Sequence, residues 1–271
     1  MNFREINMLL KDKVAVIYGA GGAIGGAVGG RFAREGAKVY LTGRRLETVR
    51  AVADKISSHG GFADAALVDA LDEAAVEAHI ASVAEKAGRI DISFNAITAV
   101  PQPGTQGIPI AELPVDSFLA PINLYMRSQF LTARAAARRM SKAGSGVILM
   151  NTPEPARIGA ALVGGMGPAW AAMEALSRNL SAELGPSGVR SIVLRSTGMP
   201  ETQTIDVVFG LHAKALGITP QQFQGFVEGM THRKRFTSVA EVAEFAAFLA
   251  SDKASAMTGT VANLTGGLIV D

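Results

Sequence analysis

Short apolar runs alternate with longer amphipathic segments along almost the whole chain, which predicts alternating strands and helices. The predicted strands cover Val14–Tyr18, Lys38–Thr42, Phe62–Val68, Ile90–Asn95, Gly146–Asn151, Val189–Arg195 and Thr260–Leu264. The predicted helices cover Ala27–Glu35, Leu46–Ser57, Glu73–Ala87, Asp116–Lys142, Ala169–Leu184 and Val239–Ser251. Repeated strand–helix units with short links predict one doubly wound α/β domain over residues 1–271. Its sheet should have about seven parallel strands with helices on both faces.

Two segments interrupt this alternation. Residues 100–114 form a loop rich in Pro and Gly before the longest predicted helix. Residues 197–237 show a less regular pattern and carry Pro200, Gly217 and Pro220. Ligands of such folds bind beyond the carboxyl ends of the strands, and loops there commonly carry function. We therefore expect the segment 197–237 to be a lid over a binding site.

A glycine-rich turn, Gly19 to Gly25, joins the first predicted strand to the first predicted helix. Strand, glycine turn and helix together are typical of a dinucleotide-binding site. The glycines let the backbone approach a pyrophosphate, and the first N–H groups of the helix then point at its negative charge. The simpler alternative is a tight strand-to-helix turn that binds nothing.

The end of the second predicted strand bears on the choice of cofactor. An acidic side chain there would bind a ribose 2′-hydroxyl group and repel a 2′-phosphate. This chain has Gly43 followed by Arg44 and Arg45, whose guanidinium groups can donate paired hydrogen bonds to a phosphate. The pattern favours NADP(H) over NAD(H). The alternative is that both arginines are solvated charges at a helix start.

Composition excludes several other classes of protein. The net charge is +2 and charged residues make up 18%, so nothing indicates a nucleic-acid partner. No apolar run is long enough for a membrane span and the start does not resemble a signal peptide, so we expect no membrane partner. The chain has no cysteine, which fits a cytoplasmic location. Its four histidines lack metal-ligand spacing, so we expect no metal.

The order of these features resembles the short-chain dehydrogenase/reductase family over nearly the whole chain. The family motif T-G-x-x-x-G-x-G appears as the run from Tyr18 to Gly25, with Tyr18 in place of Thr and Ala23 in place of the middle glycine. The resemblance implies a small-molecule substrate and a homotetramer paired through the helices 116–142 and 169–184. It implies that the cofactor contacts Gly19, Gly21, Gly22, Ala23, Ile24, Gly25, Asp69, Asn95, Ala96, Gly198 and Thr202, besides Arg44 and Arg45.

The same resemblance predicts an atypical active site. Family members reduce carbonyl groups with a Ser, a Tyr and a Lys, and an alignment through the strand 146–151 places Pro153, Met166 and Trp170 at those positions. Neither Met nor Trp can act as an acid. No Tyr or Lys occurs between Lys142 and Lys214, so a shifted alignment does not restore the set.

Other residues near these positions are candidates for the chemistry. Asn123 matches the family's helix Asn, although without the Lys it could simply satisfy backbone groups. Thr152 offers a hydroxyl group, or is a buried strand-end residue. Glu154 could hold a cation or donate a proton if burial raised its pKa, or is a solvated loop acid. Trp170 could form a flat wall against an aromatic or cationic ligand, or pack in the core.

Three functions are compatible with this pattern. The first is an NADPH-dependent reductase that transfers hydride to an activated substrate, an iminium ion or a conjugated compound, rather than to a simple ketone. The second is a non-catalytic NADP(H)-binding or regulatory protein. The third is a non-redox isomerase or cyclase that uses the same pocket. The fold alone does not choose among them.

Overall fold

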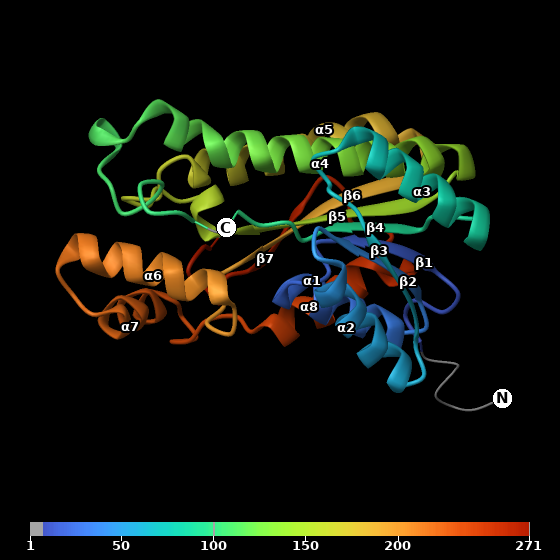
Figure 1. Ribbon diagram of the computed structural model, residues 1–271, viewed down its shortest axis with the longest axis horizontal. Helices are drawn as coiled ribbons and strands as arrows, with labels where there is room; N and C mark the ends of the chain where they lie inside the picture. The colour runs from blue at the N-terminus through green and yellow to red at the C-terminus, as the bar shows by residue number, and fades with distance from the viewer. Residues whose placement is uncertain (1–7, 100, 271) are drawn as a thin grey trace.

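The protein is described by a computed structural model, which covers residues 8–99 and 101–270. Within these residues seven parallel strands form one sheet, in the order β3-β2-β1-β4-β5-β6-β7 (Figure 1). The strands are β1 (Val14–Tyr18), β2 (Lys38–Gly43), β3 (Phe62–Leu67), β4 (Ile92–Asn95), β5 (Gly146–Pro153), β6 (Val189–Ser196) and β7 (Val261–Leu264). The order reverses beside β1, so the crevice where doubly wound folds bind ligands lies between β1 and β4.

Helices cover both faces of the sheet. In Figure 1, α3, α4 and α5 lie above it and α1, α2 and α8 below it. Their bounds are α1 (Ala23–Arg34), α2 (Leu46–Ser58), α3 (Glu73–Ala87), α4 (Val115–Ala143), α5 (Met166–Leu184) and α8 (Val239–Ala250). Alternate residues of β1 enter two separate cores, Ile17 on one face and Val16 on the other, and both are fully buried. This burial on both faces explains why the strands are continuous apolar runs.

The predicted α/β fold is confirmed, and the predicted elements differ mainly at their ends. Helix α1 begins at Ala23, four residues before the predicted start at Ala27. The glycines at the start of this helix lowered the expected helix propensity, but close packing accommodates them: a Cβ atom at Gly25 would lie 2.5 Å from the Gly19 carbonyl oxygen. Helix α5 likewise begins at Met166 instead of Ala169.

The segment 197–237 is more regular than the sequence pattern predicted. It contains two helices, α6 (Gln203–Leu216) and α7 (Pro220–Met230). Thr219 and Gln222 form a reciprocal capping box that begins α7, and Phe209 joins both helices in a small apolar cluster of their own. Of the two prolines that suggested a loop, Pro200 precedes α6 and Pro220 is the first residue of α7, a position where proline is tolerated.

In Figure 1, α6 and α7 lie beyond one end of the sheet, below the level of α4 and α5. This is the end at which β6 runs into the segment, so both helices stand at the carboxyl side of the strands. Among the described residues, no helix is long and apolar enough to cross a membrane.

Candidate functional site

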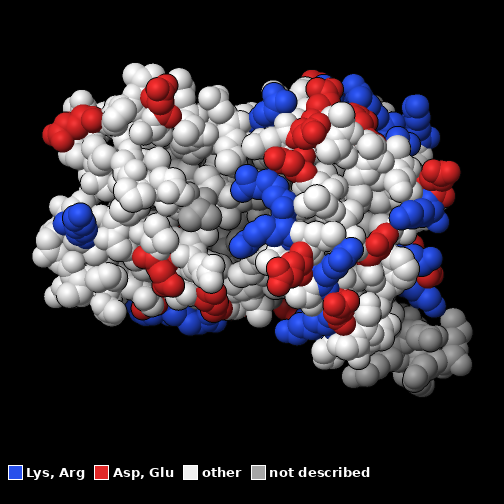
Figure 2. All heavy atoms as spheres, viewed as in Figure 1, with Lys and Arg blue, Asp and Glu red and all other residues white. Residues whose placement is uncertain are grey.

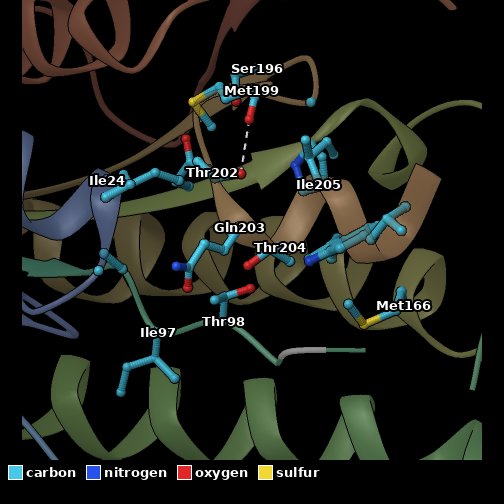
Figure 3. A pocket seen from close by; sticks show the side chains of 18 of the residues that line it. Ile24, Ile97, Thr98, Met166, Ser196, Met199, Thr202, Gln203, Thr204 and Ile205 are labelled. Carbon is cyan, nitrogen blue, oxygen red and sulfur yellow. Dashed lines mark hydrogen bonds between the residues drawn. The ribbon is translucent and has the colours of Figure 1, made fainter. Parts of the chain in front are cut away.

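A cleft with a cavity volume of about 1330 Å³ opens at the carboxyl ends of the strands. One part, called the cofactor side below, is lined by the glycine turn after β1, the start of α2 and the residues after β3. The other part, called the substrate side, is lined by the loops after β4 and β5, the start of α5, and α6 and α7. In Figure 3, Ile24 on α1, Thr98 after β4 and Met166 on α5 surround one space, and Thr204 of α6 lies between them.

At three positions of the glycine turn, the backbone conformation or the close packing disfavours a side chain. Gly19 has a φ of +75°, which disfavours other residues. A Cβ atom at Gly21 would lie 2.3 Å from the Thr48 Oγ1 atom, and one at Gly25 would lie 2.5 Å from the Gly19 carbonyl oxygen. Helix α1 begins here with Gly22 as its N-cap, and no side chain caps its first N–H groups. The turn therefore fits the pyrophosphate of a nicotinamide dinucleotide.

Arg44 and Arg45 line the same part of the cleft and are exposed. Within residues 8–99 and 101–270, neither guanidinium group has a hydrogen bond or an ion pair. A Cβ atom at Gly43 would lie 2.9 Å from the Val49 Cγ2 atom, so an acidic side chain there would need Val49 to move. Figure 2 shows basic side chains gathered near the middle of this face, whereas the side over α6 and α7 is mostly uncharged.

The other residues that the resemblance assigned to the cofactor also line the cleft: Gly19, Gly21, Gly22, Ala23, Ile24, Gly25, Asp69, Asn95, Ala96, Gly198 and Thr202. Asp69 Oδ1 accepts a hydrogen bond from the Leu71 N–H group over 3.0 Å. Asn95 is buried, and its Nδ2 atom donates to Thr132 Oγ1 over 2.9 Å. These bonds hold the segment after β3 and the end of β4 at the edge of the cleft.

Thr202 stands at the N-cap of α6 and connects this part of the cleft to the substrate side. Its Oγ1 atom donates to the Met199 carbonyl oxygen over 2.9 Å, as Figure 3 shows. The hydroxyl group therefore fixes the start of α6 through a local turn instead of capping the helix.

Glu154, Met166 and Trp170 all line the substrate side of the cleft. Glu154 directly follows β5, and its carbonyl oxygen accepts hydrogen bonds from the N–H groups of Arg157 and Ile158. Its Oε2 atom is buried and has no hydrogen-bond partner among the described residues. Because burial disfavours the charged carboxylate, the pKa of Glu154 rises to about 7. Glu154 is therefore able to hold or release a proton near neutral pH.

Thr152 does not reach the cleft. It is fully buried, and its Oγ1 atom donates to Glu174 Oε1 over 3.0 Å. Residues alternate between the two faces of a strand, so its neighbours Asn151 and Pro153 line the cleft instead. Glu174 also pairs with Arg195, whose Nη2 atom lies 2.6 Å from Oε2, and both side chains are buried. Thr152 thus belongs to a buried ionic network behind the site.

Asn123 does not line the cleft either, because its side chain is on the exposed side of α4. Tyr125, two residues later, faces inward and lines the cleft. Two residues turn a helix by more than half a circle, so a shift of this size moves a side chain to the opposite face. The Tyr125 Oη atom accepts a hydrogen bond from the Ala99 N–H group over 3.2 Å and lies 3.1 Å from Thr98 Oγ1.

Sequence reasoning missed Tyr125, Gln106 and His212, which all line the cleft. Gln106 lies in the loop before α4, and nothing in its sequence surroundings distinguishes it from other loop glutamines. His212 is on α6, within a segment that had no predicted helix and so no predicted face. The described residues contain no group of three or more His, Asp or Glu side chains that could hold a metal ion.

Comparison with known proteins agrees with this architecture. A family model described as enoyl-(acyl carrier protein) reductase matches residues 19–269. The uncharacterized oxidoreductase YxbG of Bacillus subtilis is 31% identical over 96% of this chain and 92% of its own length. The peroxisomal 2,4-dienoyl-CoA reductase SPS19 of Saccharomyces cerevisiae is 29% identical over 96% of this chain and 85% of its own length.

Solved structures give the same result. An NAD⁺-bound xylitol dehydrogenase superposes with a TM-score of 0.89 and 25% identity, covering 95% of this chain and 99% of the other. Sorbitol-6-phosphate 2-dehydrogenase of Erwinia amylovora gives a TM-score of 0.88 and 26% identity over 95% of this chain and all of the other. With its seven-stranded sheet, glycine turn and near-complete family match, the chain belongs to the short-chain dehydrogenase/reductase family of nicotinamide-dependent oxidoreductases.

Proposed function

We propose that this protein is an NADP(H)-dependent reductase whose substrate is an activated electrophile, a conjugated compound or an iminium ion, instead of a simple ketone. The observation that carries the proposal is the lining of the substrate side. Met166 and Trp170 stand where the family resemblance implies Tyr and Lys, and Glu154 is half-buried, with one buried carboxyl oxygen and a pKa of about 7. No lysine lines the cleft within the described residues.

The cofactor side supports nucleotide binding. The N–H groups at the start of α1 would receive the pyrophosphate, and the unpaired guanidinium groups of Arg44 and Arg45 would receive a 2′-phosphate. A bound dihydronicotinamide would supply hydride. The residues of the chain then have to orient the hydride acceptor and donate a proton to it where the reaction needs one.

An activated electrophile suits the groups on the substrate side. A simple ketone that accepts hydride develops a localised alkoxide, which the family's Tyr would protonate. Met166 and Trp170 have no proton to give at that position. In an iminium ion the carbon is already activated by positive charge, and in a conjugated carbonyl compound the developing charge is delocalised onto an oxygen. Glu154, when protonated, can donate to such a group.

One relative and the matching family model support a conjugated substrate. The 2,4-dienoyl-CoA reductase of yeast is named for a conjugated substrate, and the matching family model is described as an enoyl reductase. Other relatives are named for sugars, including L-rhamnose 1-dehydrogenase of Azotobacter vinelandii. The lining of the cleft, with Met166 and Trp170 in place of a proton donor, favours the first of these two groups.

The experiment that tests this proposal measures NADPH oxidation and product formation with conjugated ketones, cyclic iminium ions and their saturated ketone counterparts. Sustained oxidation with either activated class supports the proposal. Product formation without NADPH oxidation would point instead to a non-redox isomerase or cyclase. Cofactor binding without any product would point to a regulatory protein.

Replacing Arg44 with alanine is expected to weaken NADPH binding by roughly tenfold, because one charge-assisted hydrogen-bonding group to the 2′-phosphate is lost. Binding of NADH, which lacks that phosphate, should change little. Calorimetric titration of both cofactors against the wild type and the variant measures this. The control is Arg50→Ala, since Arg50 is exposed on α2 outside the cleft. Equal affinity of the wild type for NADPH and NADH would contradict the choice of cofactor.

The proposed assembly is a homotetramer paired through α4 and α5. Phe130 of α4 is 46% exposed in the single chain, which is the kind of apolar side chain that a subunit contact covers. We expect light scattering at micromolar concentration to give the mass of a tetramer, and Phe130→Glu to give smaller species. A wild-type protein that is monomeric at this concentration would contradict the prediction.

A further inference from the structure

Gln106 and His212 form a polar pair inside the mainly apolar substrate side of the cleft. Gln106 is 3% exposed and His212 is 6% exposed, and both line the cleft. The His212 Nε2 atom lies 3.1 Å from Gln106 Oε1. Phe209, Phe223 and Val227 line the cleft beside them, and the rings of His212 and Phe223 are 5.2 Å apart between centroids. A polar pair in such a place is costly unless each hydrogen-bonding group has a partner.

The loop that carries Gln106 is held firmly against α6. Gly107, the next residue, has a φ of +76°, and a Cβ atom there would lie 2.8 Å from the Leu211 carbonyl oxygen. The Gly107 N–H group also donates to the Leu162 carbonyl oxygen over 2.9 Å. These contacts bring the loop close enough for the Gln106 side chain to reach His212. The position of the amide group is therefore part of the folded cleft.

His212 determines which way the Gln106 amide faces. Burial lowers the pKa of His212, which favours the neutral ring. The amide oxygen Oε1 of Gln106 can only accept, and it faces His212 Nε2, so that ring nitrogen carries the hydrogen of this contact and the amide nitrogen of Gln106 lies on the other side. That Nε2 atom is buried and has no hydrogen-bond partner among the described residues. Its N–H groups are donors without an acceptor, in the wall of a ligand-binding cleft.

We infer that Gln106 is a substrate-recognition residue whose amide N–H group donates a hydrogen bond to the carbonyl oxygen of a conjugated carbonyl substrate. The inference rests on the proposed reductase function and narrows its substrate class. An iminium ion has no acceptor oxygen, and a cation would meet the positive end of the amide dipole. A carbonyl oxygen satisfies the buried donor, and the surrounding phenylalanines suit an apolar carbon skeleton.

The chain carries a built-in probe for this interaction, because Trp170 is its single tryptophan and lines the cleft. The test uses two unreactive ligands, 4-phenylbutan-2-one and butylbenzene, which share a phenyl ring and a four-carbon chain and differ in the ketone oxygen. Each is titrated against the full-length protein with saturating NADP⁺, and the dissociation constant is taken from Trp170 fluorescence. This readout requires binding and no turnover.

Gln106→Met keeps the length of the side chain and removes the amide. We expect this variant to weaken binding of 4-phenylbutan-2-one roughly 3- to 10-fold, the value of one hydrogen bond, and to leave butylbenzene binding within about twofold. His212→Phe should weaken ketone binding by a smaller factor, because it releases the amide without removing it. The matched control is Gln221→Met, since Gln221 is exposed on α7 outside the cleft.

A second measurement needs no variant. The infrared stretch of ¹³C-labelled 4-phenylbutan-2-one should have a lower frequency when bound to the wild type than in an aprotic solvent, because a hydrogen bond weakens the C=O bond. An unshifted stretch, unchanged ketone binding by Gln106→Met, or equal weakening of both ligands would overturn the inference.

The proposed function is tested separately, by NADPH oxidation with the conjugated ketone 4-phenylbut-3-en-2-one. If the ligand measurements agree with expectation and this ketone is not reduced, Gln106 recognises a carbonyl ligand in a protein that is not its reductase. If the ketone is reduced and Gln106→Met weakens binding of both ligands equally, the reductase function is supported and the role of Gln106 in carbonyl recognition is wrong.

Discussion

Replacing Glu174 with alanine is expected to lower the free energy of unfolding by about 3–5 kcal/mol. The Glu174 carboxylate receives hydrogen bonds from the Arg195 Nε atom over 2.8 Å and the Nη2 atom over 2.6 Å, and from the Thr152 hydroxyl group. Arg195 is only 6% exposed, so its positive charge would remain buried without a partner. Urea unfolding at pH 7, at equal concentrations of both proteins, measures the loss.

Two further variants separate this cause from a general effect of mutating α5. Glu183→Ala, at an exposed position of the same helix, should change the unfolding free energy by no more than about 0.5 kcal/mol. The double variant Glu174→Met with Arg195→Met removes both charges, and it should be less destabilised than Glu174→Ala. If the double variant is as unstable as Glu174→Ala, the loss comes from packing and not from the unpaired charge.

The fold could be predicted from the sequence because each strand carries its own signal. The apolar run Val14–Tyr18 is buried on both faces and was predicted with the bounds that the structure shows. The helices α6 and α7 could not be predicted in the same way. Pro200, Gly217 and Pro220 indicated a loop there, although apolar residues such as Phe223 and Val227 recur at helical spacing. These apolar residues pack on one another around Phe209 and line the cleft instead of the sheet.

The candidate site could be predicted only where the backbone itself does the binding. Gly21 and Gly25 lie where side chains would clash, and that constraint is visible in the sequence. The role of a side chain depends on the face of the strand or helix that it occupies. An alignment error of one residue in a strand, or of two in a helix, places the side chain on the opposite face. Thr152 and Asn123 were chosen by position in a motif and do not line the cleft. Glu154, which was also a candidate, and Tyr125, which was missed, both line it.

Replacing Glu154 with glutamine is expected to lower the rate of conjugated-ketone reduction at pH 6 by roughly 10²–10⁴-fold, the usual contribution of a general acid. The folded protein offers this acid because burial raises the pKa of Glu154 to about 7. Below that pH the carboxyl group is protonated and can donate. Above it the proton is lost, so the wild-type rate should fall about tenfold per pH unit, while the glutamine variant should show no such fall.

With an iminium substrate the rate should depend on pH in the opposite direction. This substrate therefore tests the role of Glu154 independently. Its carbon is already positively charged and needs no proton from Glu154 in the hydride step. The ionised carboxylate attracts the cation, so the rate at low substrate concentration should rise with pH through 7, and Glu154→Gln should remove the rise. Glu112→Gln, an exposed carboxyl group outside the cleft, is the control for both substrates.

Saturated ketones test whether another group of the cleft acts as the acid. Without a Tyr at the position of Met166, saturated ketones should be reduced roughly 10²–10⁴-fold more slowly than conjugated ketones of the same skeleton. Fast reduction of saturated ketones by both the wild type and Glu154→Gln would show that another group protonates the alkoxide. Tyr125 is then the hydroxyl group to replace, because its Oη atom lies in the cleft wall beside Thr98. If Tyr125→Phe lowers the rate of saturated-ketone reduction and Glu154→Gln does not, the proton donor is Tyr125 on α4 and not Glu154 in the loop after β5.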